Sequence, residues 1–427
     1  MEDFDVQVAV EDFLKKEEII HNQDDQLYYL YDESIGYYYQ VNETWLKKYI
    51  FYYLDNSGEG WSLSKERMML KALDTFVEYE ELIPKKNIVV MENGTFKIDS
   101  KELVKHSKKF RAKTAIPITY DKKAKAPIFE KFISEISCGN TALSDTLIEL
   151  LGYILVDDMN ANKAILLVGY GSNGKSTYLK LAKKLLGDDN CTNLSISDIN
   201  GRAFNRHQLC NSKFNCIHEL ESDVTLESFF SDKVKSIITG DEITAEIKGG
   251  DMYSLKPKAK LVIASNHFPR INKMPDMAVL RRYLVLPFEA SFGGNEVKLD
   301  MFEQLCEELS GIFNKAIEGY ERLKANNFVF SYESKSQEII REEIDKKFPV
   351  YGFCEKKIES CQGKFVSFAE LRDSFTTYCK EKSVGNITYS PETFANQVKQ
   401  VLSQNGISFK TTKSNGKRGL RDINIIG

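Results

Sequence analysis

The chain has 427 residues, of which 42% are hydrophobic and 28% are charged, and its formal net charge is −4. This balance is typical of a globular protein and argues against a disordered or collagen-like chain. No apolar run approaches the roughly 18 residues that a membrane-spanning helix needs, and the acidic N-terminus lacks the pattern of a signal peptide. We therefore expect a cytoplasmic protein of two or three domains with no membrane contact.

Eight cysteines and five histidines are scattered along the chain, and no two cysteines form a Cys-x-x-Cys pair. Zinc ribbons and fingers need such close pairs, so a structural metal site is not expected. We interpret the cysteines as reduced thiols of an intracellular protein.

The charge is distributed unevenly. Residues 1–50 hold twelve acids and four lysines, a net of −8, whereas residues 101–125 and 380–427 carry net charges of +7 and +5. Basic segments of this kind suit a protein that presents cationic surfaces to a polyanion. Solvated surface charge explains the pattern about equally well, so charge alone does not decide between the two interpretations.

The first 125 residues alternate helical and strand patterns. Tyrosines cluster in two of the strands, and packing of a sheet is a better explanation for them than a platform for stacking bases. The expected elements are helices at 12–20, 45–54 and 64–80, aromatic strands at 27–31 and 36–41, and a hairpin at 87–99 around a Glu-Asn-Gly turn.

From residue 126 the pattern is helical up to residue 156, after which strands alternate with helices, as in a parallel α/β unit. Helices return at 298–325. The last hundred residues are typical of a winged helix, with a basic wing near residue 417, although a module that binds only protein would give a similar pattern. The elements expected there are strands at 365–367, 407–412 and 420–426 and helices at 368–382 and 391–404.

The sharpest motif fits G-x-x-x-x-G-K-[ST] in full and lies between a buried strand, Ala164–Val168, and a helix, Thr177–Leu186. Glycines let backbone N–H groups approach phosphates, and the helix N-terminus adds a favourable dipole. We expect Lys175 to reach the β- and γ-phosphates of ATP and Ser176 to bind Mg²⁺. The predicted nucleotide-binding residues are Gly169, Gly171, Ser172, Asn173, Gly174, Lys175, Ser176 and Thr177.

Two glutamates follow the next buried strand, which begins at Phe214. A carboxylate at that end of the sheet can lie near the Mg²⁺ and polarise the attacking water. Glu219 is the first choice for this carboxylate because it ends the strand. Glu221 lies two residues further along the chain, one alternation of the strand pattern later. We interpret His218 as an incidental strand residue.

Further along, Asn266 ends the strand Ala259–Ser265 and can orient the hydrolytic water; a turn-forming asparagine is the simpler alternative. Arg281 and Arg282 directly precede the strand Tyr283–Phe288. From there an arginine reaches the phosphates of a neighbouring subunit more easily than those of its own, as an arginine finger does.

In this order and spacing, the motifs resemble a superfamily-three helicase, the compact viral branch of the AAA+ ATPases. The nearest likeness is to poxvirus-type primase–helicases and to the helicase halves of phage, plasmid and pathogenicity-island replication proteins, and residues 96–155 resemble the segment before their ATPase. The matching stretches are Gly169–Thr177, His218–Glu221, Ile238–Asp241, Lys256-Pro257, Val262–Ile271 and Asp276–Phe288.

This resemblance implies an α/β fold with a P-loop AAA+ core built on a parallel sheet. The expected domains are an α+β domain at 1–125, an ATPase domain at 126–325 with a helical lead-in at 126–156 and a core at 157–295, and a winged-helix DNA-binding domain at 330–427. It also implies a hexameric ring that hydrolyses ATP with Mg²⁺ between subunits and pulls on single-stranded DNA in its pore.

A hairpin predicted at 242–255 would contact DNA in such a pore, as it does in the family. Glu246 and Ile247 stand where basic residues are expected, so Lys248 is the only cation at the tip and Lys256 lies at the base. We expect DNA contacts at Lys248 and Lys256, and also at Lys417 and Arg418 in the basic wing.

The sequence therefore predicts an ATP-dependent replicative DNA helicase of a mobile element, with recognition of a double-stranded origin as a further role. The region before residue 160 matches the pre-ATPase segment, so a primase would be a separate polypeptide. A P-loop kinase is disfavoured because the chain has a hairpin before the strand that ends at Ser265. An initiator that binds ATP and assembles on DNA without processive unwinding stays open.

Overall fold

The computed structural model describes residues 4–22, 27–77, 79–80, 82–220, 224–246, 252–292, 300–382 and 389–426. Its internal contacts divide the chain into two compact units. The first unit comprises residues 1–220, 231–266 and 287–332, and the second comprises residues 221–230, 267–286 and 333–427.

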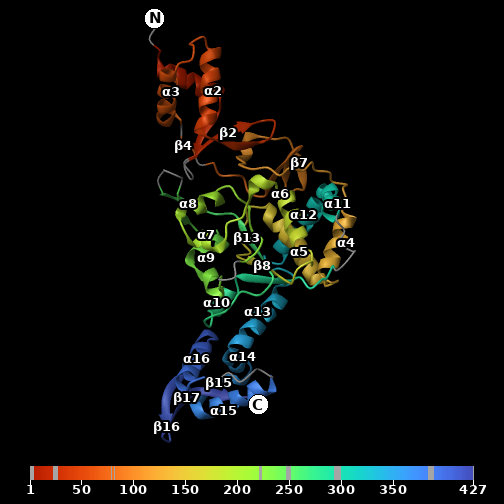
Figure 1. Ribbon diagram of the computed structural model, residues 1–427, viewed down its shortest axis with the longest axis vertical. Helices are drawn as coiled ribbons and strands as arrows, with labels where there is room; N and C mark the ends of the chain where they lie inside the picture. Colours follow the sequence, from red (N-terminus) through yellow and green to blue (C-terminus); the bar gives the residue numbers. More distant parts are fainter. Residues whose placement is uncertain are drawn as a thin grey trace. The chain divides into compact units, whose positions relative to one another are not determined.

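A parallel sheet forms the centre of the first unit (Figure 1). Four of its strands follow the order β8 (Ala164–Val168), β13 (Lys260–Ser265), β10 (Phe214–Ile217) and β9 (Cys191–Thr192). Every neighbouring pair among these four is parallel. The strands are buried almost throughout, which explains their continuous apolar sequence. The predicted α/β architecture with a parallel sheet is therefore confirmed.

Helices flank both faces of this sheet. Figure 1 shows α5 and α12 on one side of β8 and β13, and α7 and α9 on the other. The two helices α5 and α12 approach so closely that a Cβ atom on Gly152 would lie 2.1 Å from the carbonyl oxygen of Ala316. The helices are α4 (Pro127–Ile136), α5 (Thr141–Leu155), α6 (Lys175–Leu186), α7 (Ile196–Asn200), α8 (Ala203–Arg206), α9 (Asp232–Thr239), α11 (Met301–Glu307) and α12 (Leu309–Ala325).

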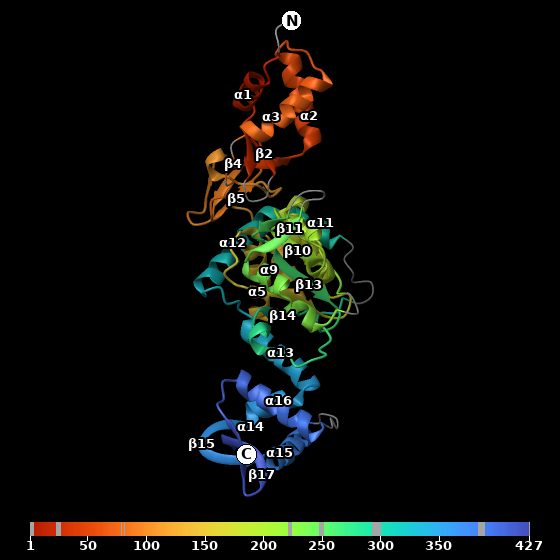
Figure 2. The same ribbon diagram turned by 90° about the vertical axis from the view of Figure 1, so that its left-hand side faces the viewer.

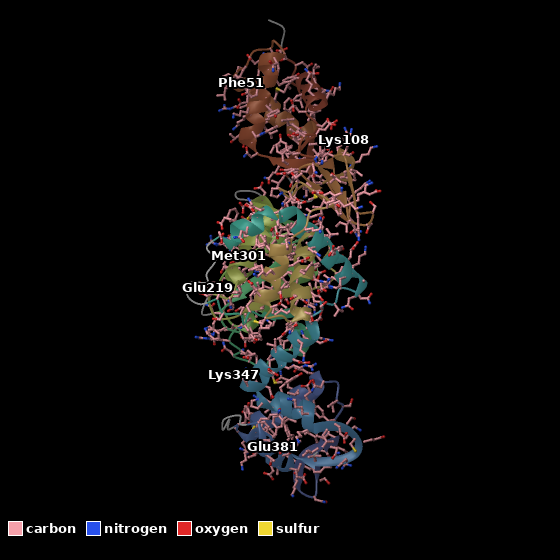
Figure 3. All side chains as sticks on the ribbon, turned by 90° about the vertical axis from the view of Figure 1, so that its right-hand side faces the viewer. Phe51, Lys108, Glu219, Met301, Lys347 and Glu381 are labelled. Atoms are coloured by element: carbon pink, nitrogen blue, oxygen red, sulfur yellow. The ribbon has the colours of Figure 1, made fainter. Side chains whose placement is uncertain are left out.

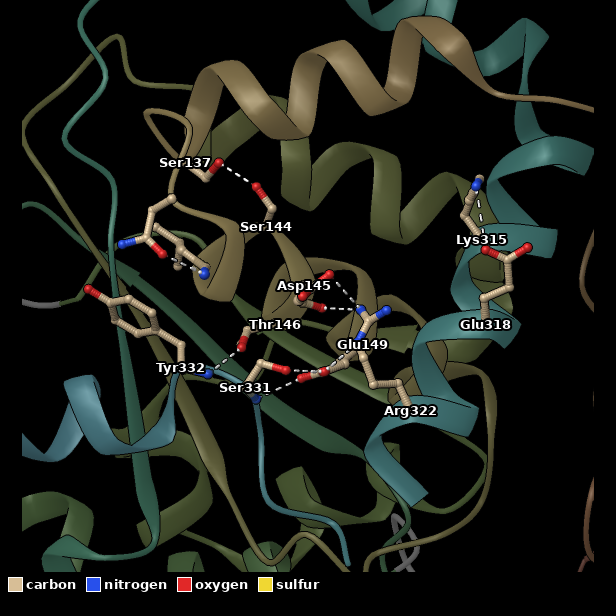
Figure 4. Close-up of polar contacts among 12 residues, drawn as sticks. Ser137, Ser144, Asp145, Thr146, Glu149, Lys315, Glu318, Arg322, Ser331 and Tyr332 are labelled. Carbon is tan, nitrogen blue, oxygen red and sulfur yellow. Dashed lines mark hydrogen bonds and ion pairs between the residues drawn. The ribbon is translucent and has the colours of Figure 1, made fainter. Parts of the chain in front are cut away.

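A buried carboxylate links α5 to α12 and to the segment that follows α12 (Figure 4). Glu149 is 1% exposed and accepts hydrogen bonds from Arg322 Nε at 2.8 Å and from the backbone N–H of Ser331 at 3.0 Å. Nearby, Tyr332 N donates to Thr146 Oγ1 at 2.8 Å. Because a buried carboxylate is costly unless it is paired, this network fixes the position of α12 on the core.

The predicted hairpin consists of β11 (Ile243–Glu246) and β12 (Met252–Leu255), which pair in antiparallel register. Its first strand is bound to α8, because the buried Arg206 donates from Nε to the carbonyl of Thr244 at 2.7 Å. Its second strand is bound through Tyr253, whose hydroxyl lies 2.6 Å from Nδ1 of His207.

The N-terminal part of the first unit contains two small sheets, ordered β3-β2-β1-β4 and β5-β6-β7. Figure 2 shows α1, α2 and α3 grouped beside β2. Tyr29 and Tyr38 are 0% and 6% exposed, in keeping with the packing role expected for the tyrosines. The elements are α1 (Val6–Lys16), β1 (Ile19–Asn22), β2 (Tyr28–Asp32), β3 (Tyr37–Val41), α2 (Glu43–Asn56), α3 (Leu63–Phe76), β4 (Tyr79–Glu80), β5 (Ile88–Met91), β6 (Gly94–Lys97) and β7 (Glu102–Val104).

Two of the expected helices in this part were wrong in their limits. The first begins six residues earlier than expected, at Val6, because Asp5 caps its N-terminus by accepting from the N–H groups of Gln7 and Val8. The third ends at Phe76, and residues 79–80 instead pair in parallel with β1. The acidic and basic segments meet within the chain, since Lys108 and Glu18 form an ion pair at 2.6 Å (Lys108 is labelled in Figure 3).

The second unit combines α10 (Met277–Leu280) and β14 (Tyr283–Pro287) with most of the C-terminal hundred residues. The backbone N–H of Val285 in β14 donates to Ser336 Oγ at 2.6 Å, which attaches this strand to α13. The sequence patterns did not predict α13 or α14. The remaining elements are α13 (Glu333–Lys347), α14 (Pro349–Lys357), β15 (Ile358–Ser367), α15 (Phe368–Glu381), α16 (Pro391–Gln404), β16 (Lys410–Ser414) and β17 (Lys417–Ile425), with the antiparallel sheet order β15-β17-β16.

None of the helices within the described ranges is both long enough and apolar enough to cross a membrane.

A buried lysine lies at the amino end of β13. The side chain of Lys260 is 1% exposed; its Nζ donates to the carbonyl oxygen of Val156 and lies 4.9 Å from the centre of the Tyr153 ring. Burial lowers the pKa of Lys260 from 10.5 to about 7, although the nearby Asp157 carboxylate opposes the shift. Asp157 itself pairs with Lys213 at 2.6 Å and with Lys258 at 3.1 Å.

We expect Lys260→Met to alter how stability depends on pH. The folded-state pKa lies below the unfolded one, so below about pH 7 both states are charged and the buried charge destabilises the fold in full. As the pH rises from 7 toward 10.5, the unfolded chain binds more protons than the folded one, and the wild-type protein gains stability. We compare the free energies of unfolding by subtracting that of the wild type from that of Lys260→Met. This difference should therefore have its most positive value below pH 7 and should decrease toward pH 10.

Urea denaturation of both proteins at several pH values measures this difference. Lys258→Met is the matched control, because it removes a lysine of the same cluster whose side chain is 39% exposed. A difference for Lys260→Met that does not change with pH would contradict the assignment of a buried, titrating ammonium.

Candidate nucleotide-binding site

The glycine-rich loop connects the carboxyl end of β8 to the first residue of α6, as its sequence predicts. Gly169 N donates to the carbonyl oxygen of Ser265 at 3.1 Å, so the loop leaves the sheet beside the end of β13. Further on, the carbonyl oxygen of Ser172 accepts from Phe292 N at 2.9 Å. The helix that follows begins at Lys175, two residues earlier than predicted.

Asn173 fixes the shape of this loop. Its side chain is 2% exposed, and Nδ2 donates to the carbonyl oxygens of Tyr170 at 2.6 Å and Phe288 at 2.9 Å. A Cβ atom on Gly169 would lie 2.1 Å from the same Phe288 oxygen. The loop is therefore packed against the segment after β14, and only glycine fits at its first position.

The two other glycines differ in what their surroundings require. Gly174 has a φ of +90°, and a Cβ atom there would lie 2.4 Å from Cγ2 of Ile136 in α4. Both the backbone conformation and the space exclude a side chain at this position. Gly171 is exposed, and a Cβ atom there would meet no atom within 4 Å. The atoms around Gly171 therefore do not explain why this position is a glycine.

Lys175, directly after the loop, places a buried ammonium group beside it. The residue is 7% exposed, and Nζ donates to the carbonyl oxygen of Gly169 and, at 3.0 Å, to Oδ1 of Asn173. Burial lowers the pKa of this lysine. Over the residues that the structure describes, Lys175 has no carboxylate within ion-pair distance. A buried ammonium with only neutral oxygen partners is chemically suited to an anion.

The first turn of α6 adds donors at the same point. Lys175, Ser176 and Thr177 begin the helix, so their backbone N–H groups have no acceptor one turn earlier within the helix. The side chain of Ser176 is exposed, and Thr177 is half-buried. This arrangement fits a polyphosphate with its Mg²⁺: Lys175 and the helix N-terminus would bind phosphate oxygens, and the Ser176 hydroxyl would bind the metal.

Register brings the predicted polar residues to the same edge of the sheet. Ser265 pairs with Val168, so Asn266 follows β13 at the level at which the phosphate loop begins. Ile217 pairs with Ile263, so the end of β10 lies on the other side of β13. Glu219, two residues beyond that end, is exposed at the surface (Figure 3), as is Asn266.

The electrostatic surroundings of His218 indicate which helix lies beside the end of β10. Burial, and then the charges of Lys183 and Lys180 in α6, lower the pKa of His218. The end of β10 therefore lies close to the helix that leaves the phosphate loop. Glu221 falls outside the described residues, so its role stays a prediction.

The remaining predicted residues lie elsewhere. Arg281 and Arg282 belong to the second unit, between α10 and β14, and their relation to the phosphate loop stays a prediction. Lys256 follows β12, is exposed, and pairs with Glu242 at 3.2 Å. The exposed Lys417 and Arg418 begin β17 and pair in register with Ser414 and Lys413 of β16. Lys248 lies outside the described residues.

Sequence reasoning missed the neighbours that position these groups. The motif allows any residue at position 173, so nothing in it marks Asn173 as the residue that joins the loop to Phe288, which lies 115 positions away. The cluster of Asp157, Lys213 and Lys258 has no motif either, because its members come from three separate segments.

Two family models match parts of the chain. Residues 17–138 match a family described as D5 N terminal like, and residues 167–282 match a family of unknown function, DUF5906. Each range spans less than a third of the chain, and the second contains the phosphate loop, Glu219, Asn266 and both arginines.

Solved structures of the NrS-1 C terminal region resemble the whole chain. One, described as the A form apo structure, is 14% identical, has a TM-score of 0.57 and covers 100% of both chains. Another, of residues 305–718, is 15% identical with the same TM-score and covers 98% of this chain and 99% of that one. At such low identity the likeness shows a shared fold alone.

We expect Lys175→Ala to reduce the affinity for ATP at least tenfold, because a hydrogen bond or ion pair to a charged phosphate contributes about 1.5–3 kcal/mol. Titration of a fluorescent ATP analogue with Mg²⁺ measures the change. Lys184→Ala is the matched control, since it removes an exposed lysine from the same helix. Equal affinities for the wild type and Lys175→Ala would place the nucleotide elsewhere.

Proposed function

We propose that this chain is an ATP-dependent DNA helicase of a replication system. The observation that carries the proposal is the buried ammonium of Lys175, which begins α6 directly after a glycine-rich loop at the carboxyl edge of a parallel sheet and has neutral oxygens as its partners. Ligands of open α/β sheets bind at this edge, and a phosphate would supply the anion that the ammonium lacks.

The residues at this edge suit hydrolysis of a nucleoside triphosphate. On binding, Lys175 would exchange the oxygens of Gly169 and Asn173 for those of the β- and γ-phosphates. Because the ammonium is already desolvated, this exchange recovers an electrostatic interaction at little further desolvation cost. Mg²⁺, bound by Ser176 and Glu219, would neutralise charge on the phosphates. Glu219 would also polarise the attacking water, and Asn266 would orient it.

The comparisons support a replicative role. The match of residues 17–138 to the D5 N terminal like family agrees with the resemblance of residues 96–155 to the pre-ATPase segment of phage-type and poxvirus-type primase–helicases. On this basis we infer that the core is a superfamily-three AAA+ module. Such modules work as rings, so the protein would form hexamers in which Arg282 or Arg281 of one subunit reaches the ATP bound by the next.

The C-terminal elements support a second contact with DNA. The order α14, β15, α15, α16, β16, β17 with the sheet order β15-β17-β16 supports the inference of a winged helix. In such a domain α16 would enter a groove of duplex DNA, and Lys417 and Arg418 in the wing would contact phosphates. We infer from this a role in origin recognition or in loading of the ring.

One observation favours the alternative, an ATP-dependent initiator that assembles on DNA without processive unwinding. At the last register pair before the hairpin tip, Glu246 lies opposite Met252, and Met252 is 69% exposed. Neither residue attracts a phosphate. The hairpin would then grip DNA weakly, and the ATP cycle would act mainly on assembly.

We expect the rate of ATP hydrolysis by the purified protein to rise severalfold when single-stranded DNA is added, because a motor couples hydrolysis to its track. Lys175→Ala should abolish both the basal and the stimulated rate. A basal rate that DNA does not change would favour the initiator. Strand displacement from a forked duplex then separates the two functions directly.

We expect Arg282→Ala, mixed with wild-type protein, to lower ATPase activity by more than its share of the total, because each variant subunit would disable its neighbour's site. Activity is measured across a series of mixing ratios at constant total protein. Arg270→Ala is a matched control from an exposed position of the same unit. A strictly proportional loss would argue against hydrolysis between subunits.

A further inference from the structure

One exposed stripe of α16 carries only neutral side chains that form hydrogen bonds. The opposite side of the helix is buried and packs into the core of the second unit through Phe394, Val398, Val401 and Leu402. Residues three and four positions apart share one face of a helix. The exposed positions follow this spacing, and the stripe consists of Thr393, Asn396, Gln400 and Ser403.

The first residue of this stripe already has a partner, whereas the two amides do not. Oγ1 of Thr393 lies 2.8 Å from Oγ of Ser390, which caps α16 by accepting from Thr393 N at 3.1 Å. The side-chain amides of Asn396 and Gln400 are exposed and have no hydrogen-bond partner within the described ranges. Each of them therefore offers a ligand both an acceptor oxygen and an NH₂ donor.

Two contacts with α15 hold α16 in one orientation. The centre of the Phe394 ring lies 5.2 Å from that of Phe375 in α15. An Nη2 hydrogen bond from Arg372, also in α15, reaches the carbonyl oxygen of Tyr389 just before α16, at 3.1 Å. Recognition groups are placed precisely when the element that carries them is fixed by packing, so α16 is a suitable support for base recognition.

The charge that a polyanion requires lies in the wing, the hairpin of β16 and β17 (blue in Figure 1). There Lys413 pairs in register with Arg418, and both side chains are exposed. Neither has a carboxylate within ion-pair distance in the part of the chain that the structure describes. Like charges directly opposite each other destabilise a hairpin, and a ligand with several negative charges would offset that cost.

The helix itself supplies no net charge. Its charged residues are Glu392, in the first turn, and Lys399, which is half-buried. A helix of this kind gains little from the phosphate backbone, which provides the sequence-independent part of DNA affinity. Contacts to phosphates position a protein on DNA, whereas contacts to base edges specify the sequence. The wing suits the first task, and the stripe on α16 suits the second.

The two free amides match adenine. In the major groove, an Asn or Gln side chain forms a pair of hydrogen bonds with N6 and N7 of adenine. Guanine presents two acceptors at the same edge, which would leave the amide oxygen without a donor. Four residues of α-helix rise about 6 Å, and base pairs are about 3.4 Å apart. Asn396 and Gln400 therefore span about two base-pair steps.

We propose that α16 reads adenines in the major groove of duplex DNA through Asn396 and Gln400, while the wing binds phosphates without reading sequence. The proposal rests on the winged-helix contact with DNA proposed above, and it names the ligand of that contact as duplex DNA rich in A·T pairs.

The test uses the full chain and two fluorescein-labelled duplexes of equal length, one of A·T pairs only and one of G·C pairs only. Binding is followed by anisotropy across a range of salt concentrations. We expect the wild type to bind the A·T duplex at least about tenfold more tightly. Asn396→Ala with Gln400→Ala should bring the two affinities within about twofold and leave the salt dependence unchanged, because no phosphate contact is lost.

The matched control is Gln362→Ala with Asn405→Ala, which removes one exposed glutamine and one exposed asparagine of the same unit outside the stripe. This control should keep the wild-type preference. Lys413→Ala with Arg418→Ala should instead weaken binding to both duplexes alike and lower the salt slope by roughly 1.8, since each phosphate contact on duplex DNA contributes about 0.9. Thermal unfolding establishes that the compared proteins are equally folded.

A second measurement changes the DNA and leaves the protein intact. Replacing adenine by 7-deazaadenine in the A·T duplex removes the N7 acceptor from the major groove and does not alter the minor-groove edge. The wild type should lose most of its preference for this duplex, and the variant without the two amides should not respond. Absence of a preference in the wild type would overturn the proposal. So would a preference that survives either change, or one that the control variant also loses.

These outcomes are separate from the fate of the helicase. Salt-dependent binding to both duplexes without preference would keep the duplex contact and reject reading by α16. Failure to bind either duplex would reject the winged-helix contact together with this inference, while DNA-stimulated ATP hydrolysis would still support the helicase. An A·T preference that depends on Asn396 and Gln400, in a chain that hydrolyses no ATP, would keep this inference and reject the helicase.

Discussion

The parallel pairing of β13 with β8 on one side and β10 on the other is the constraint on which the rest of the site depends. It aligns Ser265 with Val168 and Ile263 with Ile217, and the hydrogen bond from Gly169 N to the Ser265 carbonyl continues it into the loop. Three residues from distant parts of the chain therefore follow their strands at one edge. Without this register, Lys175, Asn266 and Glu219 would be three unrelated polar residues.

The phosphate loop keeps its shape through contacts that need no ligand. Asn173 joins the loop to the carbonyl oxygen of Phe288, and Gly174 lies against Ile136 in α4. Within this shape Lys175 is buried among neutral oxygens, which is an unfavourable environment for its charge. Such local instability is typical of a binding site, because the ligand relieves it and the surrounding packing maintains it in the ligand's absence.

The opposite edge of the sheet has its own electrostatic organisation. There the carboxylate of Asp157 binds Lys213, just before β10, and Lys258, just before β13. The same two strands end at the edge where the glycine-rich loop begins, and the hairpin base leads directly into β13. The amino end of β13 therefore adjoins the hairpin, and its carboxyl end is followed by Asn266.

The sequence alone determined the elements whose signals are local. The strands at 164–168 and 214–217, the hairpin at 88–97 and the glycine loop follow from apolar runs, turn residues and fixed spacing, all of which act within about ten residues. It misjudged α1 and α3, whose limits depend on the Asp5 cap and on the pairing of residues 79–80 with β1. Only the tertiary structure decided the partners of Asn173, the burial of Lys260 and the grouping of Asp157 with Lys213 and Lys258. These contacts join segments that lie far apart in the chain, so no local pattern of residues encodes them.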